Sequence, residues 1–79
     1  MSKDKEQYRE YYTALGLRIQ FFRKTKGYTQ EVFAEMVGIS WSFLSQIEST
    51  ACLKGISLET LFKMAEVLEI EPYQLLKKD

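Results

Sequence analysis

The sequence predicts a small all-α domain built from five helices. Apolar residues recur at spacings of three and four along most of the chain, which is the period of an amphipathic helix. No run alternates between apolar and polar for long enough to form a strand, and one proline with four glycines is too few for a turn-rich β protein. With 79 residues, the chain is expected to form one domain with a thin hydrophobic core.

The first helix is predicted from Leu15, Ile19 and Phe22, which recur at helical spacing. Lys26 and Gly27 mark its end. A cation suits the last turn of a helix, and a glycine that follows can adopt the left-handed conformation of the cap.

The residues before this helix are polar but contain Tyr8, Tyr11 and Tyr12. We expect 1–12 to form an N-terminal arm or an extension of the first helix, and 13–79 to form the folded domain. Tyrosines at this density indicate packing against the domain or against a partner, and a disordered tail is the alternative.

Two short helices are predicted in the middle of the chain. Thr29 is placed to cap the second helix, which ends at Gly38. Ser40 then caps a third helix over 41–48. In both caps, the hydroxyl accepts a hydrogen bond from a backbone N–H that has no partner within the helix.

Two more helices are predicted toward the C-terminal end. Ser57 caps a fourth helix, which carries a continuous apolar stripe at spacings of three and four. The stripe consists of Leu58, Leu61, Met64, Ala65 and Leu68. After a break that begins at Glu69, Pro72 suits the first turn of a fifth helix with Leu75 and Leu76.

The composition excludes several classes of function. The chain has no histidine, the commonest general base and metal ligand, and it shows no phosphate loop and no paired carboxylates with an evident pocket. We therefore expect no enzyme activity, no metal, no cofactor and no small-molecule substrate. Cys52 is the only cysteine, so no internal disulfide can form, and no segment resembles a signal peptide or a membrane span. These features predict a cytoplasmic protein without a membrane partner.

Charge gives a mixed signal about nucleic-acid binding. Eleven basic side chains balance eleven acidic ones, and a net charge of zero argues against a nucleic-acid binder. The basic side chains lean toward one part of the chain, since Arg18, Arg23, Lys24 and Lys26 follow one another with no acid between them. This cluster favours DNA binding, although by itself it is weak evidence, because a charge cluster is more often a solvated face.

The segment 29–48 predicts a helix, a tight turn and a second helix. Gly38 stands where the turn needs a positive φ, and Ala34 is small where two helix backbones must approach closely. With Leu44 and Ile47 buried between the helices, the third helix must present its other face to solvent. That face carries Trp41, Ser42, Ser45 and Gln46. A protruding helix of this size fits the major groove of DNA, where its N-terminal residues meet base edges.

This segment resembles the lambda-repressor and Cro-like helix-turn-helix family, often called the Xre family. The resemblance covers roughly 13–77. The matching motifs are Leu15-Gly16, Arg18-Ile19, Phe22-Arg23, Gly27-Tyr28-Thr29-Gln30, Phe33-Ala34, Gly38-Ile39-Ser40, Ser45-Gln46-Ile47-Glu48, Ser57-Leu58-Glu59-Thr60-Leu61 and Leu75-Leu76. It implies a five-helix, lambda-repressor-like DNA-binding domain whose second and third helices form the helix-turn-helix. It also implies a transcriptional regulator with double-stranded DNA as its partner.

The resemblance assigns base contacts to the third helix and a phosphate contact to the second. The residues that face bases in the family correspond to Trp41, Ser42, Ser45 and Gln46. The amide of Gln46 is suited to adenine. Gln30, at the start of the second helix, corresponds to a residue that touches a phosphate and braces the reading helix, and a helix N-terminus attracts such an anion.

Further contacts with the DNA backbone are expected from Thr29, Ser40, Lys24 and Lys54. Arg23 and Glu48 correspond to a structural ion pair of the family, which joins the first helix to the end of the third. Removal of one partner of a half-buried pair of this kind is expected to cost several kcal/mol.

The sequence departs from the family pattern in three respects. Ser49-Thr50 stand where the family usually has Arg-Gly, so a phosphate-contacting cation and a permissive glycine are missing. The loop 48–57 is longer than usual and carries a single cation, Lys54. The third helix has no Lys or Arg and presents two aromatic residues instead. Trp41 is expected either to touch DNA or to cap its own helix, and Phe43 mainly to lean on the core.

Few phosphate contacts per subunit predict modest affinity. Specific binding is therefore expected to need a homodimer that reads a two-fold operator through the third helix. Ile70, Tyr73 and Leu76, or the N-terminal tyrosines, are candidates for the dimer interface. Sealing the core is the alternative role for these groups, above all for Ile70.

We expect a repressor. The alternative function is a protein-interaction module of the antitoxin or adaptor type with the same fold, which zero net charge and the aromatic third helix favour.

Overall fold

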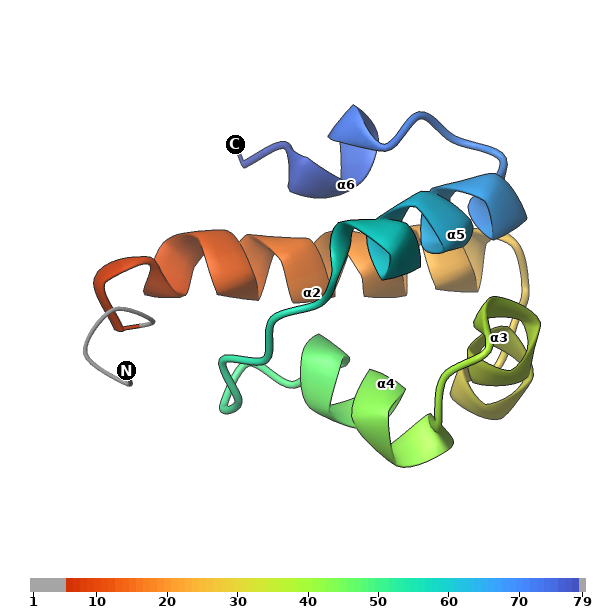
Figure 1. Cartoon of the computed structure of the whole chain (residues 1–79), viewed down its shortest axis with the longest axis horizontal. Helices are drawn as coiled ribbons and strands as arrows, with labels where there is room; N and C mark the ends of the chain where they lie inside the picture. The colour runs from red at the N-terminus through yellow and green to blue at the C-terminus, as the bar shows by residue number, and fades with distance from the viewer. Residues whose placement is uncertain (1–5, 79) are drawn as a thin grey trace.

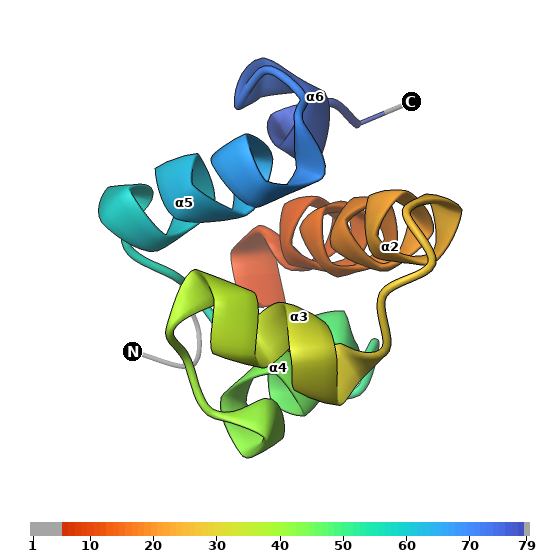
Figure 2. The same ribbon diagram turned by 90° about the vertical axis from the view of Figure 1, so that its right-hand side faces the viewer.

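The structure, a computed structural model, describes residues 6–78 and contains five α-helices within that range. They are α2 (Arg9–Thr25), α3 (Gln30–Val37), α4 (Trp41–Glu48), α5 (Leu58–Leu68) and α6 (Tyr73–Leu76). Figure 1 shows α2 crossing the middle of the molecule, with α5 and α6 on one side and α3 and α4 on the other. In the end-on view of Figure 2, α3 packs across α4 below α2. The prediction of an all-α fold with five helices is confirmed.

Hydroxyl side chains cap the three helices for which N-caps are predicted. The caps are Thr29 for α3, Ser40 for α4 and Ser57 for α5. The backbone N–H groups that donate to them belong to Val32, Phe43 and Thr60, at 3.1, 2.9 and 3.1 Å. Because each cap satisfies a free N–H of the first turn, these helices begin at the predicted residues.

The helix ends require left-handed backbone at three positions. Gly27 and Gly38 have φ values of 80° and 90°, as expected for glycines that end helices. Glu69 has a φ of 61° without being glycine, and no glycine in the sequence marks this end. Its side chain forms an ion pair with Lys26 and accepts a hydrogen bond from the Lys26 ammonium. This hydrogen bond lowers the pKa of Glu69 below its ordinary value.

The core lies between α2 and the helices on its two sides. It consists of Ile19, Phe33, Ala34, Val37, Leu44, Ile47, Leu61, Met64, Ala65, Leu68 and Leu75, none of them more than 9% exposed. Leu58 belongs to the predicted stripe of α5 but is 65% exposed, so the stripe is shorter than predicted. Leu58 shares a helix face with Ala65 but lies in the first turn of α5, where the side chain is exposed.

The first helix begins at Arg9, so residues 9–12 extend α2, and residues 1–5 of the expected arm lie outside the described part. Tyr12 is half-buried, whereas Tyr8 and Tyr11 are 50% and 59% exposed. The N-terminal tyrosines are therefore presented by a regular helix and by the turn before it.

α2 lies in close contact with the backbone of α4 at Gly16, which is buried. A Cβ at this position would lie 2.3 Å from the carbonyl oxygen of Ile47 and 3.4 Å from the Cα of Glu48. No side chain larger than hydrogen fits there unless the two helices move apart. This contact fixes the C-terminal end of α4 against α2.

Candidate nucleic-acid interface

The outer face of α4 carries the four side chains expected to meet bases. Trp41, Ser42, Ser45 and Gln46 are exposed and, together with Gln30 of α3, line one open hollow of about 610 Å³. The lining is polar and aromatic, with no charged side chain. The structure therefore brings the four base-facing candidates and one phosphate-contact candidate to a single surface.

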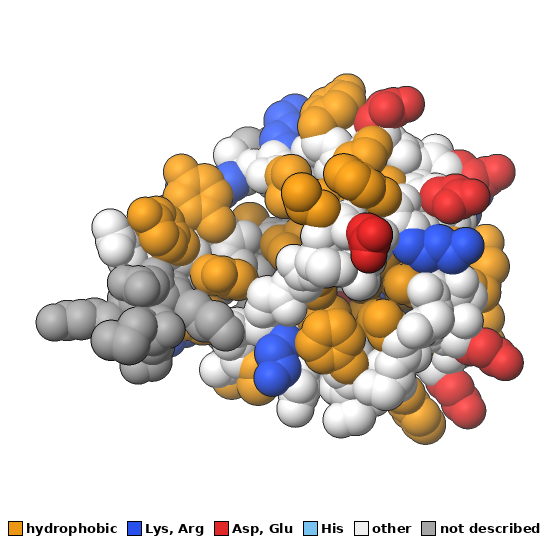
Figure 3. All heavy atoms as spheres, viewed as in Figure 1, with side chains coloured by type: hydrophobic (Ala, Val, Ile, Leu, Met, Phe, Trp, Pro, Cys, Tyr) orange, Lys and Arg blue, Asp and Glu red, His pale blue; other side chains and the backbone are white. Residues whose placement is uncertain are grey.

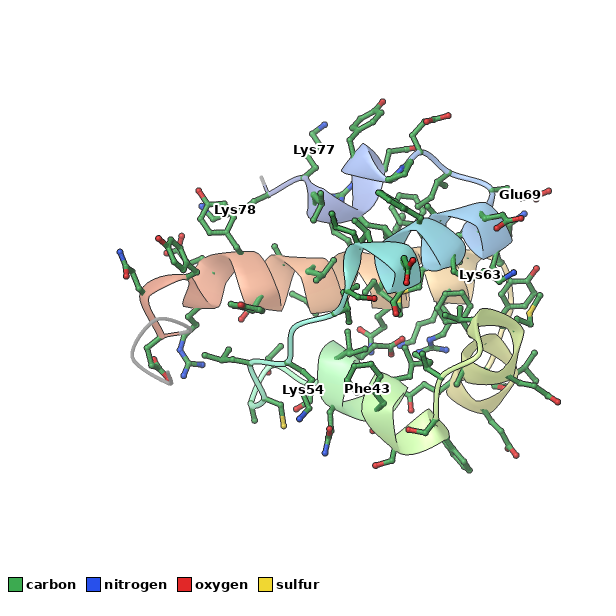
Figure 4. All side chains as sticks on the ribbon, viewed as in Figure 1. Phe43, Lys54, Lys63, Glu69, Lys77 and Lys78 are labelled. Atoms are coloured by element: carbon green, nitrogen blue, oxygen red, sulfur yellow. The ribbon has the colours of Figure 1, made fainter. Side chains whose placement is uncertain are left out.

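The buried face of α4 sets the direction of this outer face. Leu44 and Ile47 are 0% and 3% exposed and lie three residues apart, so they hold one side of α4 against the core. Phe43, labelled in Figure 4, is half-buried and packs on the same core. Of the two aromatic residues of α4, only Trp41 remains available to the outer face.

Thr29 and Ser40 stand at the N-termini of α3 and α4, and both are exposed. Each hydroxyl accepts a backbone hydrogen bond as a cap and keeps its own proton to donate. The first residues of the two helices, Gln30 and Trp41, both line the hollow. The free N–H groups of two helix N-termini therefore lie near this surface.

Lys24 and Lys54 are exposed, and neither takes part in an ion pair within the part of the chain that the structure describes. Lys24 lies in the last turn of α2. Lys54 lies on the loop that follows α4, near the C-terminal end of that helix (Figure 4). Their ammonium groups are the accessible cations among the predicted backbone contacts.

The rest of the basic cluster at 18–26 is used within the domain. Arg18 donates to the carbonyl oxygen of Gln74, and its guanidinium lies 5.6 Å from the centre of the Phe22 ring. Lys26 pairs with Glu69, and Arg23 is buried. Figure 3 shows acidic side chains along the edge of the molecule formed by α3 and the end of α5. The cluster does not form a basic patch, so its support for DNA binding is weaker than the sequence indicates.

Arg23 and Glu48 form a buried, two-pronged ion pair between α2 and α4. Nε of Arg23 donates to Oε2 of Glu48 at 2.8 Å, and Nη2 donates to Oε1 at 2.9 Å. Nη1 donates to the carbonyl oxygen of Tyr28 at 2.8 Å. The two side chains are 7% and 1% exposed, so the pair is shielded from water and fixes the end of α4.

Gln30 continues this network to the first residue of α4. Its Nε2 donates to Oε1 of Glu48 at 2.9 Å, and its Oε1 accepts a hydrogen bond from Nε1 of Trp41 at 3.3 Å. The network runs from Arg23 on α2 through Glu48 and Gln30 to Trp41. The resemblance implied that Gln30 braces the third helix, and its contact with Trp41 agrees with that expectation. The contact with Glu48 was not expected from the sequence, because no local pattern links residues 30 and 48.

No group of three or more His, Cys, Asp or Glu side chains in 6–78 is arranged to hold a metal ion. None of the described helices is both long enough and apolar enough to cross a membrane.

Comparison with known proteins finds relatives that are HTH-type transcriptional regulators. A helix-turn-helix family model matches residues 19–75. The uncharacterized HTH-type transcriptional regulator YazB of Bacillus subtilis is 45% identical over 60 residues, which cover 76% of this chain and 84% of YazB. The HTH-type transcriptional regulator SinR of B. subtilis is 37% identical over 62 residues, which cover 78% of this chain. The match covers only 55% of SinR, so the chain spans about half the length of that relative.

Solved structures give the same result. The restriction-modification controller protein C.AhdI from Aeromonas hydrophila superposes with a TM-score of 0.74 at 31% identity, covering 81% of this chain and 94% of that one. SinR, described as the master regulator for biofilm formation and solved in complex with DNA, superposes with a TM-score of 0.72 at 38% identity. That match covers 80% of this chain and 98% of the SinR chain. These relatives are regulators, in agreement with the expectation of a protein without enzyme activity. The chain belongs to the helix-turn-helix family of lambda-repressor-like, or Xre-type, transcriptional regulators.

Proposed function

We propose that the chain is a sequence-specific DNA-binding repressor that reads a two-fold operator as a homodimer through α4. The observation that carries the proposal is the single hollow lined by Trp41, Ser42, Ser45, Gln46 and Gln30. A surface that enters a DNA groove needs side chains that can donate and accept hydrogen bonds at base edges, next to a group that can bind a DNA phosphate. The side chains on α4 suit the first task and Gln30 suits the second. Its site of action would be the compartment that holds the DNA, which is the cytoplasm in bacteria.

The relatives support the DNA-binding part of this proposal. SinR, which shares the fold and 38% of the aligned residues, has been solved in complex with DNA. The matched part of SinR includes the equivalents of α3 and α4, because the match covers 98% of that chain. Repression requires only that an occupied operator excludes the transcription machinery, so it needs no surface beyond the one described.

An apolar surface lies at the start of α2 and on α6, and a second copy of the chain is the partner that suits it. Tyr8, Tyr11 and Leu76 are 50%, 59% and 55% exposed. With Tyr12 and Leu15 they line a hollow of about 280 Å³, which can take an apolar side chain from a partner. Protruding rings beside an apolar hollow make a self-complementary surface of the kind that a two-fold dimer uses. Among the C-terminal candidates, Ile70 packs on the core, whereas Tyr73 is 66% exposed.

Selection of bound duplexes from a random DNA library at low salt tests the proposal. We expect enrichment of a palindromic or nearly palindromic motif, because two α4 helices related by a two-fold axis read inverted half-sites. Enrichment of a single unrepeated half-site would contradict the dimer. Absence of any motif would contradict sequence-specific binding.

Gln46→Ala is expected to weaken binding to the selected motif by about 1–3 kcal/mol, with little change on scrambled duplexes. The exposed amide of Gln46 lines the hollow and can donate and accept at an adenine edge. Titration of labelled duplexes by fluorescence anisotropy measures both affinities. Gln7→Ala, which removes an exposed amide outside the hollow, is the matched control and should change neither. An equal loss on every sequence would refute base reading by Gln46.

Lys54→Ala is expected to weaken binding on all sequences and to reduce the magnitude of the negative slope of log affinity against log salt concentration by about 0.9 per subunit. The ammonium of Lys54 is exposed on the loop beside α4, so it can replace a counterion at a phosphate (Figure 4). Lys63→Ala on α5 is the control, because Lys63 is also exposed but lies on another helix, near Glu66. An unchanged slope for Lys54→Ala would remove this residue from the phosphate contacts.

A protein-interaction module is the second candidate function. Two observations favour it: the net charge is zero, and three of the four cations in the cluster at 18–26 are engaged within the domain. A module of this kind would enrich no duplex in the library selection, and its binding to DNA would not exceed its binding to another polyanion.

A further inference from the structure

Trp41 is the one aromatic side chain in the hollow on α4, and its indole N–H is already engaged. Nε1 of Trp41 donates to Oε1 of Gln30 at 3.3 Å, although the side chain stays largely exposed, with 55% of the residue accessible. An indole has one N–H and no acceptor. While this contact is made, Trp41 has no donor left for a base edge.

The contacts of Gln30 fix which way round its amide lies. Glu48 is acceptor-only as a carboxylate, so the group that faces it must be the NH₂ of Gln30, with Nε2 and Oε1 2.9 Å apart. The indole of Trp41 is donor-only, so the group that faces it must be the carbonyl of Gln30. Rotating the amide by 180° would place two acceptors together at Glu48 and two donors together at Trp41. Both neighbours therefore select the same orientation.

This orientation leaves one N–H of Gln30 available. The NH₂ group has two hydrogens, and only one is used by Glu48. The second has no protein partner among the described residues, while the carbonyl oxygen, which would repel a phosphate, is occupied by Trp41. Gln30 is the first residue of α3 and lines the hollow, so its free donor belongs to the surface that would face DNA.

We propose that Trp41 is a positioning residue: its indole N–H holds the Gln30 amide in the orientation that donates a hydrogen bond to a DNA phosphate. The inference rests on the proposed DNA-binding function and assigns Trp41 a role in holding the backbone contact instead of reading a base through its N–H. Glu48, held in turn by Arg23, is the fixed end of the same arrangement.

The proposed contact has an electrostatic signature of its own. A neutral amide that donates to a phosphate displaces no counterion, whereas a lysine does. Loss of the contact should therefore weaken binding equally on all sequences without changing the salt slope. Base reading by Trp41 would weaken binding only on the preferred motif, and loss of a cation would change the slope.

Trp41→Phe tests the proposal, because phenylalanine keeps an aromatic ring but lacks the N–H. We expect about three- to tenfold weaker binding, equal on the selected motif and on scrambled duplexes, with an unchanged salt slope. In a Gln30→Ala background the same substitution should have no further effect, because the amide that Trp41 positions is gone. In the free protein, the side-chain amide NMR signals of Gln30 should shift in Trp41→Phe. Phe62→Leu, at an exposed aromatic residue of α5, is the control and should leave affinity unchanged.

Three outcomes would overturn the inference alone, given that the wild-type chain binds duplex DNA. They are no loss of affinity in Trp41→Phe, a loss confined to the preferred motif, and an equal loss with and without Gln30. Failure of the wild-type chain to bind any duplex would instead overturn the proposed function, and the phosphate contact with it. Because Trp41 is largely exposed, its replacement should leave the melting temperature close to that of the wild type, which a thermal melt verifies.

Discussion

Glu48→Ala is expected to lower the free energy of unfolding by about 3–5 kcal/mol. The substitution leaves the guanidinium of Arg23 buried with only the carbonyl oxygen of Tyr28 as a partner, since both other hydrogen bonds of Arg23 end on Glu48. An unpaired charge in a site as enclosed as this one costs far more than an exposed ion pair contributes. Chemical unfolding followed by circular dichroism measures the change.

The expected loss is a large share of the total stability. A domain of this length is stabilised by on the order of 5–10 kcal/mol, so Glu48→Ala should be partly unfolded at moderate temperature. Glu66→Ala, which removes an exposed partner 4.0 Å from Lys63, is the control and should change stability by less than about 1 kcal/mol. A loss for Glu48→Ala as small as that of the control would show that the Arg23–Glu48 pair is not structural.

The double variant Arg23→Met/Glu48→Leu distinguishes the net contribution of the ion pair from the cost of leaving one charge buried and unpaired. Replacing both charges by apolar side chains leaves no unpaired group, so the loss should be well below the sum of the two single losses. It also removes the acceptor that holds Gln30. We therefore expect the double variant to fold but to bind DNA more weakly than the wild type on every sequence.

The helices could be predicted from sequence because their signals are local. Thr29, Ser40 and Ser57 accept backbone hydrogen bonds three residues ahead, and Gly38 ends α3 through its own φ. Such signals depend on neighbouring residues only, and they survive in any tertiary context. The outer face of α4 was predictable for a similar reason, since two buried residues on an eight-residue helix determine which side is left exposed.

The features that were not predictable depend on contacts between distant segments. Leu58 continues the stripe of α5 in sequence, yet its side chain is exposed in the structure. Arg18 and Lys26 read as a basic cluster, yet their partners lie more than forty residues away, at Gln74 and Glu69. The contact of Gln30 with Glu48 crosses between helices in the same way. Pairings of this kind follow from how the helices pack, which no local pattern encodes.

Gly16→Ala is expected to destabilise the domain by about 1–3 kcal/mol, although alanine at an ordinary position in a helix is favoured over glycine by about 1 kcal/mol. The new Cβ would lie 2.3 Å from the carbonyl oxygen of Ile47. That oxygen belongs to the backbone of α4 and cannot rotate away as a side chain can. α2 and α4 must therefore separate, and the core between them loses contact. A thermal melt of the variant measures the sign of the effect directly.

Gly55→Ala is the matched control for this prediction. Its Cβ would lie 3.7 Å from Cε1 of Tyr12, an ordinary contact, and its φ is not positive. We expect no loss of stability there, and a gain of up to about 1 kcal/mol because alanine restricts the unfolded chain. Equal melting temperatures for the two variants would show that α2 and α4 are not held in close contact at Gly16.

The effect of Gly16→Ala should also reach the hollow lined by Gln30 and the outer face of α4. Gly16 contacts the end of α4 that holds Glu48, and Glu48 in turn holds Gln30. Displacement of that end should loosen the Gln30 amide, although Gly16 itself does not line the hollow. We therefore expect Gly16→Ala to weaken DNA binding at temperatures where it remains folded, equally on the selected motif and on scrambled duplexes. Normal affinity in the folded variant would mean that the reading surface does not depend on the close approach of α2 and α4.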